Sequence, residues 1–225
     1  MKKLSMLLFA LGAVALLSAG VAKKKKKVIF FGDSITQAGV GPEGYITQLN
    51  GLLEKSHAGQ YELIGAGIGG NKVYDLYLRM EKDVLEKKPD VVVIYVGIND
   101  VWHKASQRTG TDFDKFGGFY KALIKKIQDN GAKVIVCTPS VIGEKKDGSN
   151  EQDADLDKYS GLIRTISKDQ NLPLVDLRKA FLDYETANNP ENKEKGVLTS
   201  DRVHLNKAGN AFVAEQMAKA ITGLK

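Results

Sequence analysis

Cysteine and histidine are scarce in this sequence. Its 225 residues contain one cysteine, Cys137, and three histidines. A secreted scaffold held by disulfides needs paired cysteines, and a structural metal cluster needs several cysteine or histidine ligands. Both classes of protein are therefore excluded. Cys137 ends an apolar run at residues 133–137 that is typical of a strand, and we expect a buried structural thiol there.

Signatures of cofactor binding are also missing. The glycine-rich stretch at residues 65–71 lacks the Lys-Ser/Thr ending of a P-loop, and its glycines do not follow the dinucleotide-binding spacing. We therefore expect no cofactor and no bound metal. The sequence also lacks internal repeats, long linkers and breaks in composition. It predicts one domain, from about residue 27 to residue 225.

The N-terminus has the three parts of a signal peptide. Residues 1–3 are basic, residues 4–17 are apolar apart from Ser5, and residues 18–22 supply small residues for cleavage. The apolar run is short for a membrane span, although an uncleaved anchor is an alternative. No cysteine follows, so lipid attachment is not expected. We predict that the signal peptide, residues 1–22, is cleaved after Ala22. The mature protein would then be exported, periplasmic or secreted, without stable membrane insertion.

Positive charge is concentrated at the N-terminus. The formal net charge of the chain is +6. Two lysines of the signal segment contribute +2 and the five lysines at residues 23–27 contribute +5, so the rest of the chain has a net charge near −1. A nucleic-acid-binding domain would spread basic residues over a folded face. We therefore expect no nucleic-acid partner. The lysine run is interpreted as a solvated linker, with weak contact to anionic lipid or cell wall as the alternative.

Strand-like and helix-like patterns alternate along the rest of the chain. Such alternation indicates an α/β fold with a mainly parallel sheet, right-handed crossovers and helices on both faces. A loop containing Trp102, His103 and Gly110 is expected, as are a charged surface loop at residues 143–155 and a helical turn near Phe181 and Tyr184. Asn206 can cap the last helix. The strands are predicted at residues 28–31, 61–64, 90–96, 132–138 and 172–176.

A serine follows the first predicted strand closely. Ser34 lies two residues after Gly32, at the edge where reacting groups gather in an open α/β sheet. A serine becomes a nucleophile when a histidine takes its proton and a carboxylate orients that histidine. His204 lies immediately before the last predicted helix and has an acid three residues earlier, Asp201. Alone, this spacing also fits a capping aspartate beside a surface histidine.

Four sequence blocks stand out along the chain: Gly32-Asp33-Ser34-Ile35, Gly67 after the second strand, Gly97-Ile98-Asn99-Asp100 and Asp201-Arg202-Val203-His204. Together they resemble the SGNH, or GDSL-type, hydrolase family. They follow the family's order and cover most of the predicted domain, although Gly65 and Ile98 replace the common Asn and Thr. The resemblance implies a three-layer α/β/α sandwich with a five-stranded, flavodoxin-like parallel sheet.

The resemblance also implies a role for each matching residue. Ser34 would be the nucleophile and, through its backbone N–H, an oxyanion donor. The backbone N–H of Gly67 and the side chain of Asn99 would complete the oxyanion hole. His204 would act as general base and then general acid, and Asp201 would orient it.

Neighbouring residues receive structural or substrate-binding roles. Asp33 and Asp100 are expected to fix turns rather than to react. Trp102 and His103 are candidates to line the substrate pocket, with ordinary loop packing as the alternative.

By resemblance, the protein is expected to be an exported serine hydrolase that cleaves carboxylic esters through an acyl-enzyme. A small-molecule or glycan ester is the expected partner, with short acyl groups such as acetyl esters of carbohydrates favoured. A lysophospholipase- or thioesterase-type acylhydrolase, and a non-catalytic carbohydrate-binding protein on the same scaffold, are the alternatives. The sequence gives no indication of the oligomeric state.

Overall fold

Five parallel strands form the central sheet of the structure, a computed structural model that describes residues 24–224. Their order across the sheet is β2-β1-β3-β4-β5, which is the flavodoxin-like order. The predicted α/β fold and five-stranded parallel sheet are therefore confirmed. The strands are β1 (Lys26–Gly32), β2 (Tyr61–Gly67), β3 (Val91–Tyr95), β4 (Lys133–Cys137) and β5 (Leu174–Val175).

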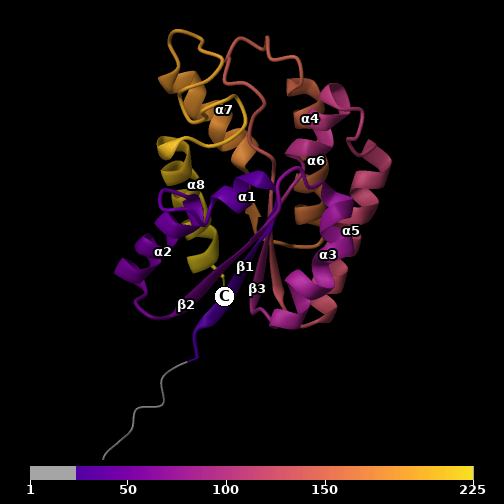
Figure 1. Ribbon diagram of the computed structural model, residues 1–225, viewed down its shortest axis with the longest axis vertical. Coiled ribbons are helices and arrows are strands. Elements are labelled where there is room, and N and C mark those ends of the chain that lie inside the picture. The colour runs from indigo at the N-terminus through magenta and orange to yellow at the C-terminus, as the bar shows by residue number, and fades with distance from the viewer. Residues whose placement is uncertain (1–23, 225) are drawn as a thin grey trace, which may run out of the picture.

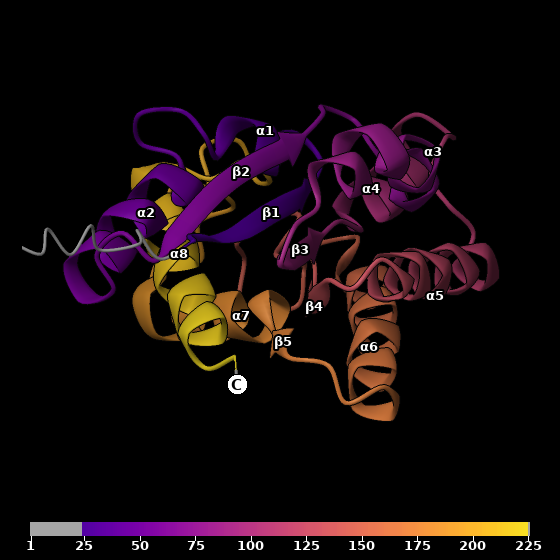
Figure 2. The ribbon, with the colours of Figure 1, turned by 90° about the horizontal axis from the view of Figure 1, so that it is seen from below.

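Helices cover both faces of this sheet (Figures 1 and 2). Helices α2 and α8 pack together on one face, and α3, α5 and α6 form the layer on the other. No helix within residues 24–224 combines the length and the apolar character needed to cross a membrane. The helices are α1 (Ser34–Ala38), α2 (Tyr45–Ser56), α3 (Val73–Asp83), α4 (Ile98–Ser106), α5 (Phe113–Asp129), α6 (Asp153–Asp169), α7 (Leu177–Asn188) and α8 (Lys207–Thr222), with a 3₁₀ turn at Leu85–Lys87.

The central strands carry the core. Residues 28–31 of β1 and 92–94 of β3 are completely buried, as expected for strands covered by helices on both faces. Cys137 at the end of β4 is a buried free thiol, and its Sγ lies 3.9 Å from Met217 Sδ of α8. Burial raises the pKa of this thiol well above its ordinary value. The predicted structural role of Cys137 is confirmed.

Two predicted boundaries near the site were wrong. The segment that contains Trp102 and His103 is the helix α4, not a loop. Its apolar residues Ile98, Val101, Trp102 and Ala105 recur at helical spacing, and Asp100 in its first turn and basic residues in its last turn complement the helix dipole. Strand β2 continues three residues beyond the predicted end, through Gly67, because these residues pair with the end of β1. That pairing overrides the weak strand preference of glycine.

Three other predictions need correction. The region around Phe181 is a complete helix, α7, capped by Asp176, whose side chain accepts from Lys179 N–H. Residues 143–155 do not form a purely solvated loop, because Glu144 is fully buried. The lysine run is not entirely a linker, because Lys26 and Lys27 belong to β1.

The capping prediction at the last helix is confirmed. The Asn206 side chain accepts from Gly209 N–H and caps the start of α8. The predicted signal peptide, residues 1–22, lies outside the described residues, and the predicted domain boundaries stay predictions.

Candidate active site

Ser34 lies at the carboxyl end of β1, where the chain turns directly into α1. Asp33 caps this helix, accepting from Ile35 N–H at 3.0 Å. A Cβ at Gly32 would lie 2.4 Å from both Thr36 Oγ1 and the backbone oxygen of Tyr95, so the tight turn requires glycine. Burial raises the pKa of Asp33 to about 7. Its contacts agree with the predicted structural role.

The structure brings the three predicted catalytic side chains together. Ser34 Oγ lies 2.9 Å from His204 Nε2, and His204 Nδ1 lies 2.7 Å from Asp201 Oδ2. The other carboxylate oxygen of Asp201 accepts from the backbone N–H groups of His204, at 2.8 Å, and Val203, at 3.1 Å. Each side chain therefore has a partner that orients it, in the order serine, histidine, aspartate.

Asp201 is held as an ionised carboxylate. Partial burial acts to raise its pKa, but the hydrogen bonds from the backbone and ring of His204 and from Val203 N–H outweigh it. The pKa of Asp201 consequently lies below its usual value. A negative charge beside Nδ1 favours the tautomer in which Nε2 is free to take a proton from Ser34.

Asn99 lies in the first turn of α4, which follows β3, the strand next to β1. Its side chain is 1% exposed, and Nδ2 donates to the Asn71 carbonyl oxygen at 3.1 Å. One amide hydrogen is thereby fixed, and the second stays available to another acceptor. Next to it, Asp100 accepts from Val73 N–H at 3.1 Å and ties α4 to the start of α3.

Gly67, the third predicted oxyanion donor, ends the edge strand β2. The next residue, Ile68, donates its N–H to the Gly32 oxygen on β1 at 3.3 Å. Because N–H groups alternate in direction along a strand, the Gly67 N–H points away from β1, toward the outer edge of the sheet. A Cβ at Gly67 would lie 2.1 Å from Gln37 N. This glycine allows β2 and α1 to approach closely.

A second glycine, Gly70, lies in the turn between β2 and α3 and was missed by the sequence analysis. Its φ of +75° favours glycine, and its N–H has no hydrogen-bond partner among residues 24–224. A Cβ added at the preceding residue, Gly69, would lie 3.9 Å from Ser34 Cβ, so the turn passes beside the serine. The available signal was the glycine-rich stretch itself.

Arg79 of α3 joins the two strand ends that border the site. Its Nη2 donates to the carbonyl oxygens of Gly32, at 2.7 Å, and Ala66, at 3.0 Å. Its Nε donates to Asn71 Oδ1 at 2.6 Å, and the guanidinium lies 4.6 Å from the centre of the Phe31 ring. Arg79 therefore holds β1, β2 and the Gly70 turn in one arrangement.

The two predicted pocket residues project from α4. The ring centre of Trp102 lies 6.2 Å from that of His204, edge to face, so Trp102 borders the triad. His103 packs beside Trp102 and near Gly70. Burial, and then the charge of Lys72, lower the pKa of His103, and its buried Nδ1 has no partner among the described residues.

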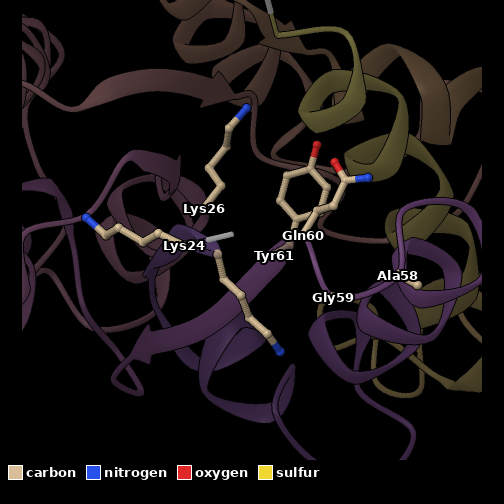
Figure 3. A pocket seen from close by; sticks show the side chains of 7 residues that line it. Lys24, Lys26, Ala58, Gly59, Gln60 and Tyr61 are labelled. Carbon is tan, nitrogen blue, oxygen red and sulfur yellow. The ribbon is translucent and has the colours of Figure 1, made fainter. Parts of the chain in front are cut away.

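A hollow at the opposite end of the sheet is separate from this site. Lys24, Lys25 and Lys26 line it at the start of β1, together with Tyr61 at the start of β2 (Figure 3). The lysine side chains point in different directions and do not converge on a common centre. Within residues 24–224, no group of three or more His, Cys, Asp or Glu side chains could hold a metal ion.

Comparisons with known proteins agree with this geometry. The chain matches the GDSL-like Lipase/Acylhydrolase family over residues 30–212. An acetylxylan esterase of Geobacillus stearothermophilus is 30% identical over 215 residues, covering 87% of this chain and 94% of that protein. Uncharacterized lipoprotein YqeF of Bacillus subtilis is 25% identical over 209 residues, covering 84% and 86%.

Solved structures agree as well. The crystal structure of the acetyl xylan esterase AlAXEase has a TM-score of 0.85 and 64% identity, covering 87% of this chain and 99% of that one. That of Axe2, from G. stearothermophilus, has a TM-score of 0.77 and 28% identity, covering 89% and 95%. Axe2 variants described as catalytic mutants replace a serine, or an aspartate and a histidine three positions apart. The present chain therefore belongs to the GDSL-like lipase/acylhydrolase family and is a carboxylic-ester hydrolase.

Proposed function

We propose that this esterase removes acetyl groups from an acetylated glycan such as acetylated xylan, with Ser34 as nucleophile. The observation that carries the proposal is the 2.9 Å approach of Ser34 Oγ to His204 Nε2, with Asp201 on the other ring nitrogen. The substrate class rests on the acetylxylan esterases to which the chain is similar.

Acylation starts with proton transfer. His204 Nε2 takes the proton of Ser34 Oγ while Oγ attacks the acetyl carbonyl carbon, and Asp201 stabilises the resulting imidazolium. The tetrahedral intermediate collapses when His204 donates this proton to the sugar oxygen, which leaves as an alcohol. Water then attacks the acetyl-enzyme with His204 again as base, releasing acetate and restoring Ser34.

The negative charge of the tetrahedral oxygen needs donors that are already in place. The Ser34 N–H and the free amide hydrogen of Asn99 are two of these donors. For the third, we assign the Gly70 N–H in place of the predicted Gly67 N–H. This choice is supported by the unpaired N–H of Gly70 and by the outward direction of the N–H of Gly67.

Short acyl groups are the proposed preference. Trp102 of α4 places a ring beside the triad, with the ring of His103 packed against it, and a bulky wall limits the length of acyl chain that fits next to Ser34. The proposal also includes export, because the N-terminal sequence has the parts of a signal peptide and one relative is a lipoprotein. N-terminal sequencing of protein recovered outside the cytoplasm tests the export and the cleavage after Ala22.

The central test combines labelling with turnover. Wild type should be labelled by a fluorophosphonate probe at Ser34 and should release acetate from acetylated xylo-oligosaccharides. Ser34→Ala should lose labelling and about 10⁴-fold or more of turnover while keeping its thermal stability. Ser56→Ala, at an exposed position at the end of α2, is the matched control.

The competing functions predict other results. Preference for lysophospholipids or acyl thioesters over the acetylated sugar would replace the proposed substrate class but keep the nucleophile. Glycan binding without labelling or turnover would identify a carbohydrate-binding protein and overturn the catalytic assignment.

A further inference from the structure

We propose that Glu144 is a positioning residue that fixes the turn carrying Asp201 and His204. Glu144 follows β4 and is fully buried. Its Oε1 accepts from the N–H groups of Leu198 and Thr199, both at 2.6 Å, and its Oε2 accepts from Val197 N–H at 2.8 Å. One carboxylate thus binds three consecutive backbone groups just before the catalytic turn. This inference rests on the proposed roles of Asp201 and His204.

The segment that Glu144 binds has little regular structure of its own. It connects the end of α7 to the start of α8, and its only bridge in the described structure pairs Thr199 with Leu205. The ladder of a helix or sheet therefore does not hold it in place. Hydrogen bonds to an ionised acceptor are stronger than neutral ones, and burial protects them from water.

The bonds continue from Glu144 into the catalytic turn. Thr199 Oγ1 accepts from Arg202 N–H at 3.2 Å, and Gly143, next to Glu144, donates its N–H to the Arg202 oxygen at 2.8 Å. Arg202 lies between Asp201 and His204 in the sequence, with a φ of +89° that a residue with a side chain rarely adopts. The surroundings must hold this conformation. One of the two contacts to Arg202 comes from Gly143, next to Glu144 in the chain, and the other comes from Thr199, whose N–H binds Glu144.

A second buried carboxyl provides a matched comparison. Glu185 of α7 is also fully buried, and neither of its oxygens has a hydrogen-bond partner among the described residues. Burial, and then the charge of Glu144, raise the pKa of Glu185 to about 8. Glu185 is therefore mainly neutral at pH 7, and it makes no bond to the catalytic turn.

The test replaces each carboxyl with its neutral isostere. Glu144→Gln leaves one oxygen and adds an NH₂ group that faces at least one backbone N–H, so the three bonds cannot all form. We expect kcat on p-nitrophenyl acetate to fall between about 10- and 100-fold, because small displacements of catalytic groups are costly. KM should change by less than about twofold. Fluorophosphonate labelling should slow in parallel with kcat.

Two readouts separate positioning from simple destabilisation. The acid limb of the kcat/KM profile should move to lower pH in Glu144→Gln, because a loosened Asp201 stabilises the imidazolium less. The amides of residues 197–199 should lose hydrogen-exchange protection. Glu185→Gln, assayed at pH 7, should keep the wild-type kcat and pH profile.

The inference is overturned if Glu144→Gln lowers the melting temperature but keeps the wild-type kcat and pH profile. If Glu144→Gln does not fold, Glu144→Asp keeps the charge but is one methylene shorter, and it should show the same changes to a smaller degree. Wild-type activity in folded Glu144→Asp would then overturn the inference. Failure of the proposed function is distinguishable, because wild type itself would then show no labelling at Ser34.

Discussion

Ser34 Oγ lies 2.9 Å from His204 Nε2, although 170 sequence positions separate the two residues. The contact depends on how α8 docks beside the first part of the domain. Helix α8 packs against α2, and Asn210 near its start accepts from the N–H of Tyr45, the first residue of α2, at 2.8 Å. The turn that carries His204 immediately precedes α8, so this docking brings the imidazole to the end of β1.

Asn99→Ala should lower turnover by roughly 10²–10³-fold, because one oxyanion donor is lost. The fold should remain, since Asn99 makes one side-chain bond, to the Asn71 oxygen. Steady-state rates on p-nitrophenyl acetate and a melting curve measure both effects. Asn188→Ala is the control, because the side-chain amide of Asn188 also donates to one backbone carbonyl, that of Tyr184, on the exposed side of α7. Unchanged turnover in Asn99→Ala would remove this side chain from the oxyanion hole.

The two glycines of the β2–α3 region should respond differently to alanine. Gly67→Ala forces a Cβ against backbone atoms of α1 and should mainly lower the melting temperature. Gly70→Ala has space but an unfavourable φ, which costs about 1–2 kcal/mol, and it should mainly lower kcat by displacing the N–H. The reverse pattern, with kcat lost only in a stable Gly67→Ala, would restore the original assignment to Gly67.

Trp102→Ala should change the preferred acyl length. Removing the ring beside His204 opens space near Ser34, so the rate on p-nitrophenyl butyrate should rise relative to the rate on the acetate. Trp102→Phe, which keeps a ring, should remain close to wild type. A constant ratio of the two rates in Trp102→Ala would show that Trp102 does not limit the acyl group.

Glu185 should make stability depend on pH. Its pKa is about 8 in the folded protein and about 4.5 in the unfolded chain, so the folded state binds the extra proton. The contribution of the Glu185 carboxyl to the free energy of unfolding is fully present below pH 4.5 and is lost as the pH rises to about 8. As the pH rises from 5 to 8, the melting temperature of Glu185→Gln should therefore increase relative to that of wild type, by at least about 2–4 °C. Parallel curves for the two proteins would contradict this expectation.

Much of the fold could be predicted from local patterns. Residues 28–31 and 91–95 are continuous apolar runs because β1 and β3 are buried on both faces, and burial is what such runs report. Helix α4 has apolar residues at helical spacing, but it was predicted as a loop because Asn99 and Asp100 directly after a strand are good turn formers. The end of β2 was missed because its glycines pair only with β1, so a tertiary partner decided that segment.

The site divides in the same way. The sequence by itself determined which groups are present for catalysis: a serine after a strand, and an aspartate three residues before a histidine. It also predicted for them the chemistry of a nucleophile with a general base. Only the tertiary structure decided which glycine N–H is left without a partner beside Ser34, and that Glu144 binds the segment leading to His204. The physical reason is that the buried Glu144 carboxylate is bound by backbone N–H groups more than fifty positions away. Since a backbone N–H group does not depend on the side chain, no residue pattern marks these partners in the sequence.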